Sequence, residues 1–236
     1  MGILRLTLTP QAPLTVPLSR CEGLQGLFYR LLSADGPLAD EIHDKAPGEH
    51  RPYKFYCFTD LHGTYTALPG GRRYEGPLTW EVRAADERII AAVTAATAAG
   101  QLRLYDTPCA VTATPVELPA YGEERLLTMD TPLTVYRTDH TRHTVYYAPD
   151  DPRFARGVEG NIRRKWRAFC GEEIDGLSFT PTAVPADARR VIRYKQTVLT
   201  AYYGQYRLLA PPAVQAFLQL VGLGAKNGMG LGTISM

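Results

Sequence analysis

Five glycines fall within eleven residues near the end of the 236-residue chain, from Gly222 to Gly232, with Lys226 at the centre of the segment. Glycine loses more backbone entropy on folding than any other residue. Such density is therefore expected where the backbone takes positive φ or approaches another group closely. Backbone N–H groups around one cation suit a polyanion that is held by its phosphates. The alternative is a tight glycine turn with a solvated lysine.

The sequence on either side of this segment argues against a triphosphate site. Residues 211–221 predict a helix, because Pro211-Pro212 suits a first turn and apolar residues recur at i, i+3, i+4 and i+7. Gly222 then ends the helix, and residues 231–236 predict a final strand. A P-loop runs instead from strand to helix and ends in Gly-Lys-Ser/Thr. The reversed order disfavours a nucleotide-binding metabolic enzyme.

The spacing within the segment is specific: Leu223-Gly224, five residues that include Lys226, then Gly230-Leu231-Gly232. It resembles the C-terminal signature of the CRISPR-associated endoribonucleases that cut repeat RNA into guide RNAs. These enzymes belong to a larger repeat-associated RNA-binding superfamily, many members of which carry the loop without cleaving. The loop alone therefore implies RNA binding. The residues expected to contact RNA there are Gly222, Gly224, Lys226, Asn227, Gly228, Gly230 and Gly232.

Three motifs near the N-terminus are similar to landmarks of the cleaving members: Gly26-Leu27-Phe28-Tyr29, Glu41-Ile42-His43 and Tyr53-Lys54-Phe55-Tyr56-Cys57-Phe58-Thr59. The landmarks are a tyrosine on the first helix, a histidine after the second helix, and a lysine that opens a strand. The resemblance implies Tyr29, His43 and Lys54 as the catalytic residues. The connection 44–53 is longer than in the family and carries a second histidine, His50, so the histidine role is open between the two.

These residue types suit RNA cleavage by the RNA's own 2′-OH. The 2′-OH attacks the adjacent phosphorus when a base takes its proton, while a cation steadies the phosphate and an acid protonates the leaving 5′ oxygen. His43 and Tyr29 suit the two proton transfers, in either order, and Lys54 suits charge stabilisation. The family resemblance implies a 2′,3′-cyclic phosphate and a 5′-hydroxyl as products. No cluster with metal-ligand spacing is present in the sequence, so we expect metal-independent cutting without a cofactor.

A basic helix and a strand supply further candidates for RNA contact. Between Arg153 and Arg167, six basic residues accompany one acid, Glu159. This imbalance suits phosphate contact and a solvated helix face equally. In the strand region that follows, two basic residues alternate onto one face. The additional residues expected to contact RNA are Arg163, Arg164, Arg167, Arg193 and Lys195.

The elements predicted around the N-terminal motifs have the order β-α-β-β-α-β, which is the ferredoxin-like motif. The first helix begins with a Ser-x-x-Glu capping box at Ser19. Its apolar stripe is Leu24, Leu27, Phe28, Leu31 and Leu32. The other predicted elements are strands at 3–9, 55–61 and 78–82, a short helix at 37–42, a Gly/Arg loop at 70–73, a helix at 86–99 and a strand from 102.

The second half is predicted to repeat this order. Asp151 and Pro152 begin its basic helix as N-cap and first residue. The strands are expected at 112–118, 125–136 and 177–184, with a long strand or hairpin at 191–206. Pro108 and Pro115 place the boundary near 106–115. We therefore predict an α+β chain of two tandem ferredoxin-like domains, 1–110 with the catalytic residues and 111–236 with the glycine loop.

Composition narrows the class of protein. Hydrophobic residues make up 45% of the chain, which supports folded cores. No apolar run reaches membrane-spanning length, and the N-terminus lacks a signal-peptide pattern. The four scattered cysteines form no CxxC pair, so we expect reduced thiols and a cytoplasmic location. Because the net charge is only +2, an RNA site must come from local clustering.

Two functions remain. The first is a metal-independent endoribonuclease that cuts CRISPR repeat transcripts into guide RNAs. The second is a non-catalytic RNA-binding subunit of a guide-RNA effector complex. The presence of all three N-terminal landmarks favours the nuclease. The expected partner is CRISPR repeat RNA or the guide RNA made from it, while effector-complex subunits and a second copy of the chain are further partners that the sequence leaves open.

Overall fold

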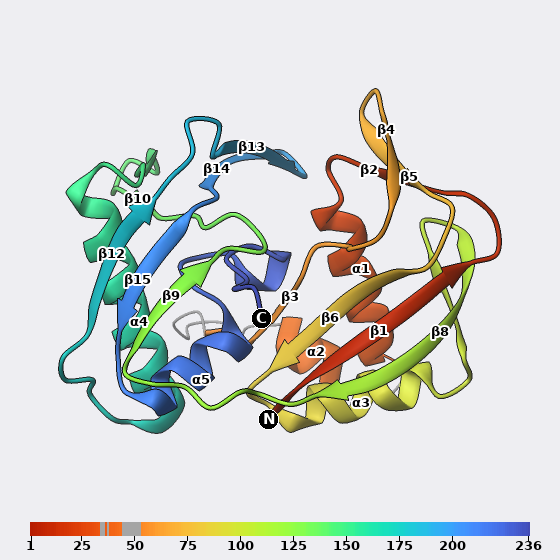
Figure 1. Cartoon of the computed structure of the whole chain (residues 1–236), viewed down its shortest axis with the longest axis horizontal. Helices are drawn as coiled ribbons and strands as arrows, with labels where there is room; N and C mark the ends of the chain where they lie inside the picture. Colours follow the sequence, from red (N-terminus) through yellow and green to blue (C-terminus); the bar gives the residue numbers. More distant parts are fainter. Residues whose placement is uncertain (34–35, 37, 44–52) are drawn as a thin grey trace.

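The structure is a computed structural model that describes residues 1–33, 36, 38–43 and 53–236, with only the backbone of His43. The two halves of the chain form two lobes that lie side by side (Figure 1). The elements of the first half are β1 (Gly2–Pro10), β2 (Leu14–Pro17), α1 (Cys21–Ser33), α2 (Leu38–His43), β3 (Tyr56–Phe58), β4 (Tyr65–Leu68), β5 (Gly71–Tyr74), β6 (Leu78–Ala84), α3 (Glu87–Thr97), β7 (Gln101–Leu104) and β8 (Thr107–Val116).

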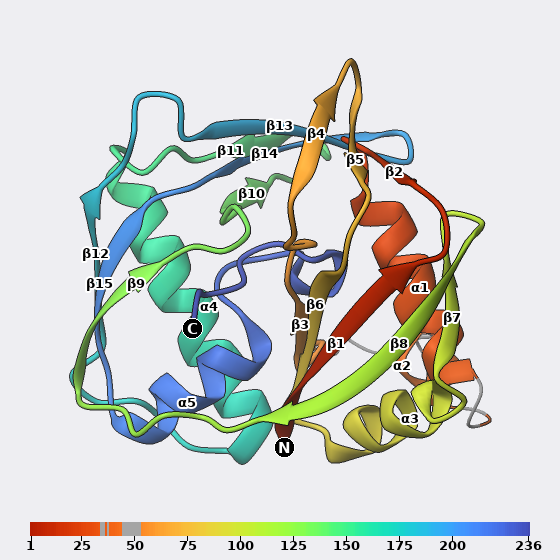
Figure 2. The same cartoon turned by 45° about the vertical axis from the view of Figure 1, so that its right-hand side comes forward.

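The first lobe is an antiparallel sheet with the strand order β3-β6-β1-β8-β7, covered on one face by α1 and α3 (Figure 2). The four strands β3, β6, β1 and β8 have the ferredoxin-like order, and β7 adds an edge. Helix α1 buries Leu24, Leu27, Phe28, Leu31 and Leu32 against this sheet. The predicted apolar stripe of the first helix is therefore confirmed.

Strand β8 crosses the predicted boundary between the halves. It pairs with β1 from Cys109 to Val116, opposite Pro10 to Ile3. The interpretation of residues 112–118 as a strand of the second half was wrong, because these residues complete the first sheet. The predicted division at 110/111 falls inside this strand.

The second lobe repeats the arrangement with shorter strands. Its sheet has the order β12-β15-β9, and α4 and α5 lie beside it (Figure 1). The elements are β9 (Glu124–Thr128), β10 (Tyr136–Thr138), β11 (Thr144–Tyr146), α4 (Pro152–Cys170), β12 (Ser178–Ala183), β13 (Arg189–Tyr194), β14 (Thr197–Tyr202), β15 (Gln205–Leu209), α5 (Pro212–Val221) and the 3-10 turn η1 (Asn227–Met229). Together the lobes form the tandem ferredoxin-like fold that was predicted.

Two predictions about the second half need correction. The long strand or hairpin at 191–206 is divided, with β13 and β14 forming a separate two-stranded hairpin and β15 joining the main sheet. Residues 231–236 do not form a strand. They run beside β9 in the place of the fourth ferredoxin strand, but only Ile234 makes a bridge, to Met129. The N-cap at Asp151 is confirmed, since its side chain accepts from Arg153 N.

A small sheet with the order β2-β5-β4 was not predicted. The Gly/Arg segment 70–73 was interpreted as a loop, but Gly71 begins β5 and its backbone approaches Val16 of β2. A Cβ atom on Gly71 would lie 2.7 Å from the Val16 carbonyl oxygen, so glycine permits this pairing. The β4–β5 hairpin projects from the first lobe (Figure 2).

The lobes are tied together by a buried arginine. Arg83 of β6 is 1% exposed and donates through Nη1 to the carbonyl oxygen of Ile234 at 2.6 Å. Its charge is balanced by Glu81, which accepts from Nη2 at 2.6 Å. Because a buried charge is costly without a partner, this pair fixes the end of the second lobe against the first sheet. The glycine-rich segment lies at the same junction (Figure 1).

Candidate active site beneath the glycine-rich loop

The glycine-rich loop is buried between the lobes, with η1 packed against α1 and β3. The expectation that its backbone N–H groups are free for a polyanion was wrong for much of the loop. Six of them donate to protein carbonyl groups: those of Gly222, Leu223, Ala225, Met229, Gly230 and Gly232. Ala225 and Lys226 are the more exposed residues of the segment. The loop is therefore chiefly a packed element, and it presents one cation to solvent.

The glycines are required by close packing. A Cβ atom on Gly232 would lie 2.0 Å from the Leu223 carbonyl oxygen, and one on Gly230 would lie 2.5 Å from the Phe58 ring. Both residues also have positive φ, 73° and 77°. No other residue type fits these two positions without moving the neighbouring backbone or core. This agrees with the close approach inferred from the glycine density.

Asn227 holds the two ends of the loop together. Its Nδ2 donates to the carbonyl oxygens of Leu223 and Leu231, both at 2.8 Å. Its Oδ1 accepts from Lys165 Nζ at 2.6 Å. The side chain is 5% exposed. Asn227 was expected to contact RNA, but the structure uses both ends of its amide inside the protein.

Lys165 comes from α4 and was counted only as part of the basic helix. Its side chain is 2% exposed, and Nζ also donates to the Gly222 carbonyl oxygen at 2.9 Å. Burial lowers the pKa of Lys165 to about 7, against an opposing charge effect of Cys57. The signal that could have found it is spacing. The residues that α4 buries are Phe154, Val158, Ile162 and Lys165, one lysine on an apolar stripe.

Tyr29 and Lys54, two of the implied catalytic residues, lie together under the loop. Lys54 Nζ donates to Tyr29 Oη at 2.6 Å and lies 5.3 Å from the centre of the tyrosine ring. The hydroxyl of Tyr56 lies 2.9 Å from that of Tyr29. Gln25 of α1 connects this cluster to the loop, because its Nε2 donates to the Gly228 carbonyl oxygen at 2.6 Å. The hydroxyl of Tyr194, in β13, donates to the same Gln25 side chain.

A pocket of about 470 Å³ joins this cluster to the loop. Lys54 and Lys226 line it together with the buried Lys165, and no carboxylate does so among the described residues, so the two more accessible lysines suit a phosphate group. Lys226 enters from the opposite wall, where its Nζ lies 5.7 Å from the centre of the Tyr136 ring. The residues lining the pocket are Gln25, Tyr29, Tyr53, Lys54, Tyr136, Asn161, Lys165, Tyr194, Gly224, Ala225, Lys226, Asn227, Gly228 and Met229.

The third implied catalytic residue cannot be placed at this pocket. The backbone of His43 ends α2, and its side chain lies outside the described part of the structure, as does the whole of His50. Within the described residues, no three His, Cys, Asp or Glu side chains converge as a metal site would require. The choice between His43 and His50 stays a prediction.

The basic residues expected to contact RNA have different surroundings. Arg164 is exposed and donates to the hydroxyl of Tyr53, at the pocket. Arg163 donates to the carbonyl oxygen of Ile174, and Arg167 pairs with Glu173. These two guanidinium groups therefore already have protein partners. The backbone N–H of Lys195 donates to Glu22, which joins the β13–β14 turn to α1.

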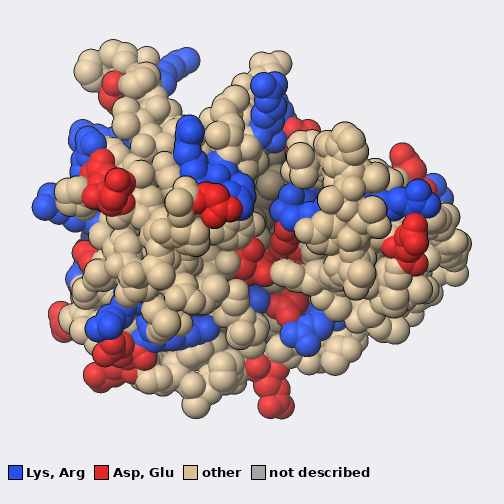
Figure 3. All heavy atoms as spheres, turned by 45° about the horizontal axis from the view of Figure 1, so that its top comes forward, with Lys and Arg blue, Asp and Glu red and all other residues tan. Residues whose placement is uncertain are grey.

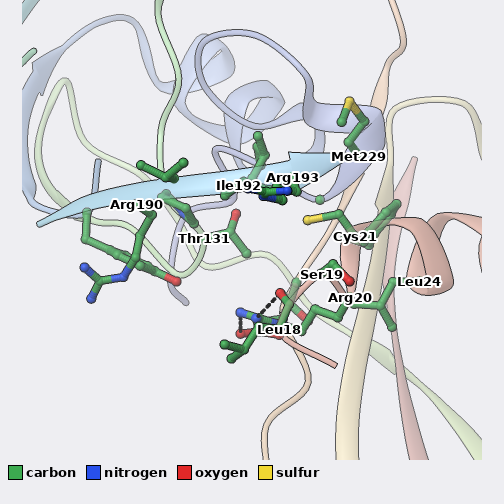
Figure 4. A pocket seen from close by; sticks show the side chains of 18 of the residues that line it. Leu18, Ser19, Arg20, Cys21, Leu24, Thr131, Arg190, Ile192, Arg193 and Met229 are labelled. Carbon is green, nitrogen blue, oxygen red and sulfur yellow. Dashed lines mark hydrogen bonds and ion pairs between the residues drawn. The ribbon is translucent and has the colours of Figure 1, made fainter. Parts of the chain in front are cut away.

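A second pocket, of about 550 Å³, is lined by residues of both halves of the chain and by Met229 of the glycine-rich segment (Figure 4). Met229 lines both pockets, and Arg193 of β13 lines the second. Arg20 and Arg72 both bind the carboxylate of Asp60 there. Burial works to raise the pKa of Asp60, but the hydrogen bond and charge of Arg20, followed by the charge of Arg72, hold it below its usual value.

Lys and Arg side chains lie on both sides of the hollow between the lobes (Figure 3). The cations around the second pocket outnumber its single carboxylate, since the lining includes Arg190 and Arg193 as well as the two arginines on Asp60. Asp and Glu side chains also lie within the hollow (Figure 3), so the excess of positive charge that would attract a phosphate backbone belongs to the lining of the second pocket.

The sequence matches the family model of CRISPR associated protein Cas6, C-terminal, over residues 115–236. The comparison with curated proteins finds no match. Among solved structures, "CRISPR associated protein Cas6" is 18% identical with a TM-score of 0.78, over 99% of this chain and 98% of the other. "An RAMP protein binding different RNA substrates" is 14% identical with a TM-score of 0.83, over 100% and 99%. A "Cas6 product complex" is 19% identical with a TM-score of 0.65, over 99% and 98%. These structural likenesses concern the fold.

None of the helices among the described residues is long and apolar enough to cross a membrane.

Proposed function

Because the chain belongs to the family of CRISPR-associated protein Cas6, we propose that it is a metal-independent endoribonuclease that cuts CRISPR repeat transcripts into guide RNAs. The observation that carries the proposal is the hydrogen bond of 2.6 Å between Lys54 Nζ and Tyr29 Oη, beneath the glycine-rich loop. A cation and a phenol at one point of a pocket rich in lysine are the groups that a transesterification at phosphorus requires.

In the proposed reaction, the 2′-OH of the nucleotide before the cut attacks the adjacent phosphorus. The 2′-oxygen loses its proton to a base as the new P–O bond forms. The bond from phosphorus to the 5′ oxygen breaks, and an acid protonates that oxygen. Tyr29 takes one of the two proton transfers and His43 the other. The products are a 2′,3′-cyclic phosphate and a 5′-hydroxyl.

Lys54 stabilises the negative charge that develops on the phosphate oxygens. Its ammonium already points at Tyr29 Oη, so it lies beside both the reacting phosphate and the proton-transfer group. Lys226, on the opposite wall, holds the RNA backbone. The RNA strand continues from this pocket past Met229 into the second pocket, where the arginines meet further phosphates.

The test is a cleavage assay on repeat RNA from the host's own CRISPR locus, with a metal chelator present. A matched RNA with a 2′-deoxy nucleotide at the cut position serves as control. We expect the first RNA to be cut and the second to be bound but left intact. Loss of cutting in chelator would contradict the metal-independent mechanism, while tight binding of both RNAs without cutting would favour the non-catalytic subunit of an effector complex.

Variants assign the roles. Lys54→Ala should reduce the cleavage rate on the order of 10²- to 10³-fold, and Tyr29→Phe on the order of 10²- to 10⁴-fold. Both should bind the 2′-deoxy RNA with nearly the affinity of the wild type. His43→Ala should abolish cutting in the same way. If His43→Ala cuts RNA and His50→Ala does not, the histidine role belongs to His50. Association with effector subunits or a second copy, and a cytoplasmic location, stay predictions.

A further inference from the structure

Tyr56 was not among the residues singled out from the sequence, yet it contacts the proposed catalytic pair. It is the first residue of β3 and follows Lys54, which precedes the strand, by two positions. Its ring is stacked on Phe28, with centroids 4.4 Å apart and an interplanar angle of 20°. The residue is 1% exposed. Its hydroxyl, 2.9 Å from that of Tyr29, is therefore held in one place by a rigid core.

The glycine-rich loop covers this hydroxyl. A Cβ atom on Gly228 would lie 2.9 Å from Tyr56 Oη and 3.0 Å from Lys54 Cδ. The bare Gly228 backbone thus packs directly on the cluster and leaves no room beside it for another side chain. A buried hydroxyl without a hydrogen-bond partner is costly, and the one partner of the Tyr56 hydroxyl among the described residues is Tyr29.

The direction of this hydrogen bond depends on the protonation state of Tyr29. Burial, together with the neighbouring Tyr29, raises the pKa of Tyr56 far above its usual range, so Tyr56 keeps its proton at any pH at which RNA is stable. Tyr29 is the more exposed of the two and faces the pocket. Either hydroxyl can donate while both tyrosines are neutral, but once Tyr29 has lost its proton Tyr56 must be the donor, and Tyr29 Oη then accepts from Tyr56 and from Lys54.

We propose that Tyr56 is a positioning residue for the cleavage reaction: its hydroxyl fixes Tyr29 Oη at the pocket and stabilises the phenolate form of Tyr29. The inference rests on the proposed function. It does not depend on which proton transfer Tyr29 performs. As the acid, Tyr29 becomes a phenolate when its proton passes to the 5′ oxygen. As the base, it is a phenolate before it takes the proton of the 2′-OH. A donor at Tyr29 Oη stabilises both states.

The test is Tyr56→Phe, which removes the hydroxyl and keeps the stacked ring. We expect the single-turnover cleavage rate to fall roughly 10- to 100-fold, as for loss of a hydrogen bond to a charged group, while affinity for 2′-deoxy repeat RNA changes less than about twofold. Tyr74→Phe is the matched control, because that tyrosine is equally buried, its hydroxyl donates to the Leu61 carbonyl oxygen at 3.3 Å, and neither residue lines the pocket. An unchanged rate in Tyr56→Phe would overturn the inference.

A double-mutant cycle separates positioning from a general structural role. In the Tyr29→Phe background, where no phenolate can form, Tyr56→Phe should have no further effect on the residual rate. Equal effects of Tyr56→Phe in both backgrounds would contradict the proposal.

A measurement without RNA tests the hydrogen bond between Tyr56 and Tyr29 separately from the proposed function. The hydroxyl proton of Tyr56 should give a slowly exchanging, downfield NMR resonance in the wild type, because it is buried and donated to Tyr29. This resonance should move in Tyr29→Phe and vanish in Tyr56→Phe. Its absence from the wild type would refute the hydrogen bond even if the protein cuts RNA, and its presence would support the bond even if the protein does not.

Discussion

The ammonium group of Lys165 lies 2.6 Å from the side-chain oxygen of Asn227, and both side chains are buried. This contact joins the basic helix α4 to the glycine-rich loop. Both oxygens that accept from Lys165 Nζ, the carbonyl oxygen of Gly222 and the amide oxygen of Asn227, are neutral, so no carboxylate takes part in this contact. The glycine-rich loop that covers the pocket therefore has its shape set by the Asn227 amide and the buried Lys165 side chain, and both can be tested.

Asn227→Ala should destabilise the protein by at least about 3 kcal/mol, because two backbone carbonyl groups lose a donor and Lys165 loses an acceptor. Urea unfolding at constant pH measures the change in the free energy of unfolding. The matched control is Asn161→Ala on the wall of the same pocket, since the amide oxygen of Asn161 has no partner among the described residues. Similar effects of the two substitutions would contradict the role of Asn227.

The stability of the protein should rise with pH above neutrality through Lys165. Its pKa is about 7 in the folded chain, against 10.5 for an ordinary lysine. Between these values the unfolded chain holds one more proton at this site, so raising the pH favours folding, by at most about 1.4 kcal/mol per pH unit. The measurement is urea unfolding at pH 7.0, 7.75 and 8.5, for the wild type and for Lys165→Met. Curves of unfolding free energy against pH that stay parallel for the two proteins would disprove this.

Gly228→Ala should impair cleavage more than it impairs folding. The added Cβ would meet Tyr56 Oη and Lys54 Cδ, and displacement of a catalytic group by about 1 Å costs on the order of 10²-fold in rate. The readout is the single-turnover rate beside the midpoint of thermal unfolding. Gly76→Ala is the control, because nothing lies within 4 Å of a Cβ atom at Gly76. Full activity in Gly228→Ala would show that the loop does not set the geometry of the cluster.

Lys226→Ala should weaken RNA binding without unfolding the protein. Lys226 is half-exposed, and its ammonium lies over the Tyr136 ring in the lining of the pocket. Loss of one phosphate contact should reduce the slope of log affinity against log salt by about 1. Fluorescence anisotropy with 2′-deoxy repeat RNA at several KCl concentrations measures this slope. Arg103→Ala, in the edge strand β7, should leave it unchanged, and an equal loss in both variants would argue against a specific contact at Lys226.

The sequence was sufficient for features that local patterns determine. The stripe of α1 and the cap at Asp151 depend on neighbouring residues, and both are confirmed. The tandem fold followed from element order. Strand β5, which Gly71 begins, was missed because two glycines and two arginines are typical of a loop, while the pairing of Gly71 with Pro17 of β2 is a long-range contact.

The site was harder to predict, because its organisation depends on contacts between the lobes. Tyr29 and Lys54 came from motifs, but the burial of Lys165 among apolar residues is set by how α4 packs. The loop was interpreted as a row of free donors, since nothing local shows that the Ala225 N–H would meet the Thr134 carbonyl oxygen or that Gly232 would meet Pro132. The role of Tyr56 required the distance to Tyr29, which no spacing in the sequence supplies.

The pocket is closed by a contact between Gln25 and Gly228, which are 203 residues apart in the chain. Contacts of this separation pay the largest loop-closure entropy, and they form late in folding. The first lobe can therefore bring Tyr29 and Lys54 together before the glycine-rich loop packs over them. Under the proposed function, a chain that has folded only its first lobe would hold Tyr29 and Lys54 together without the loop that covers them, so cutting of RNA would begin only when the second lobe has folded onto the first.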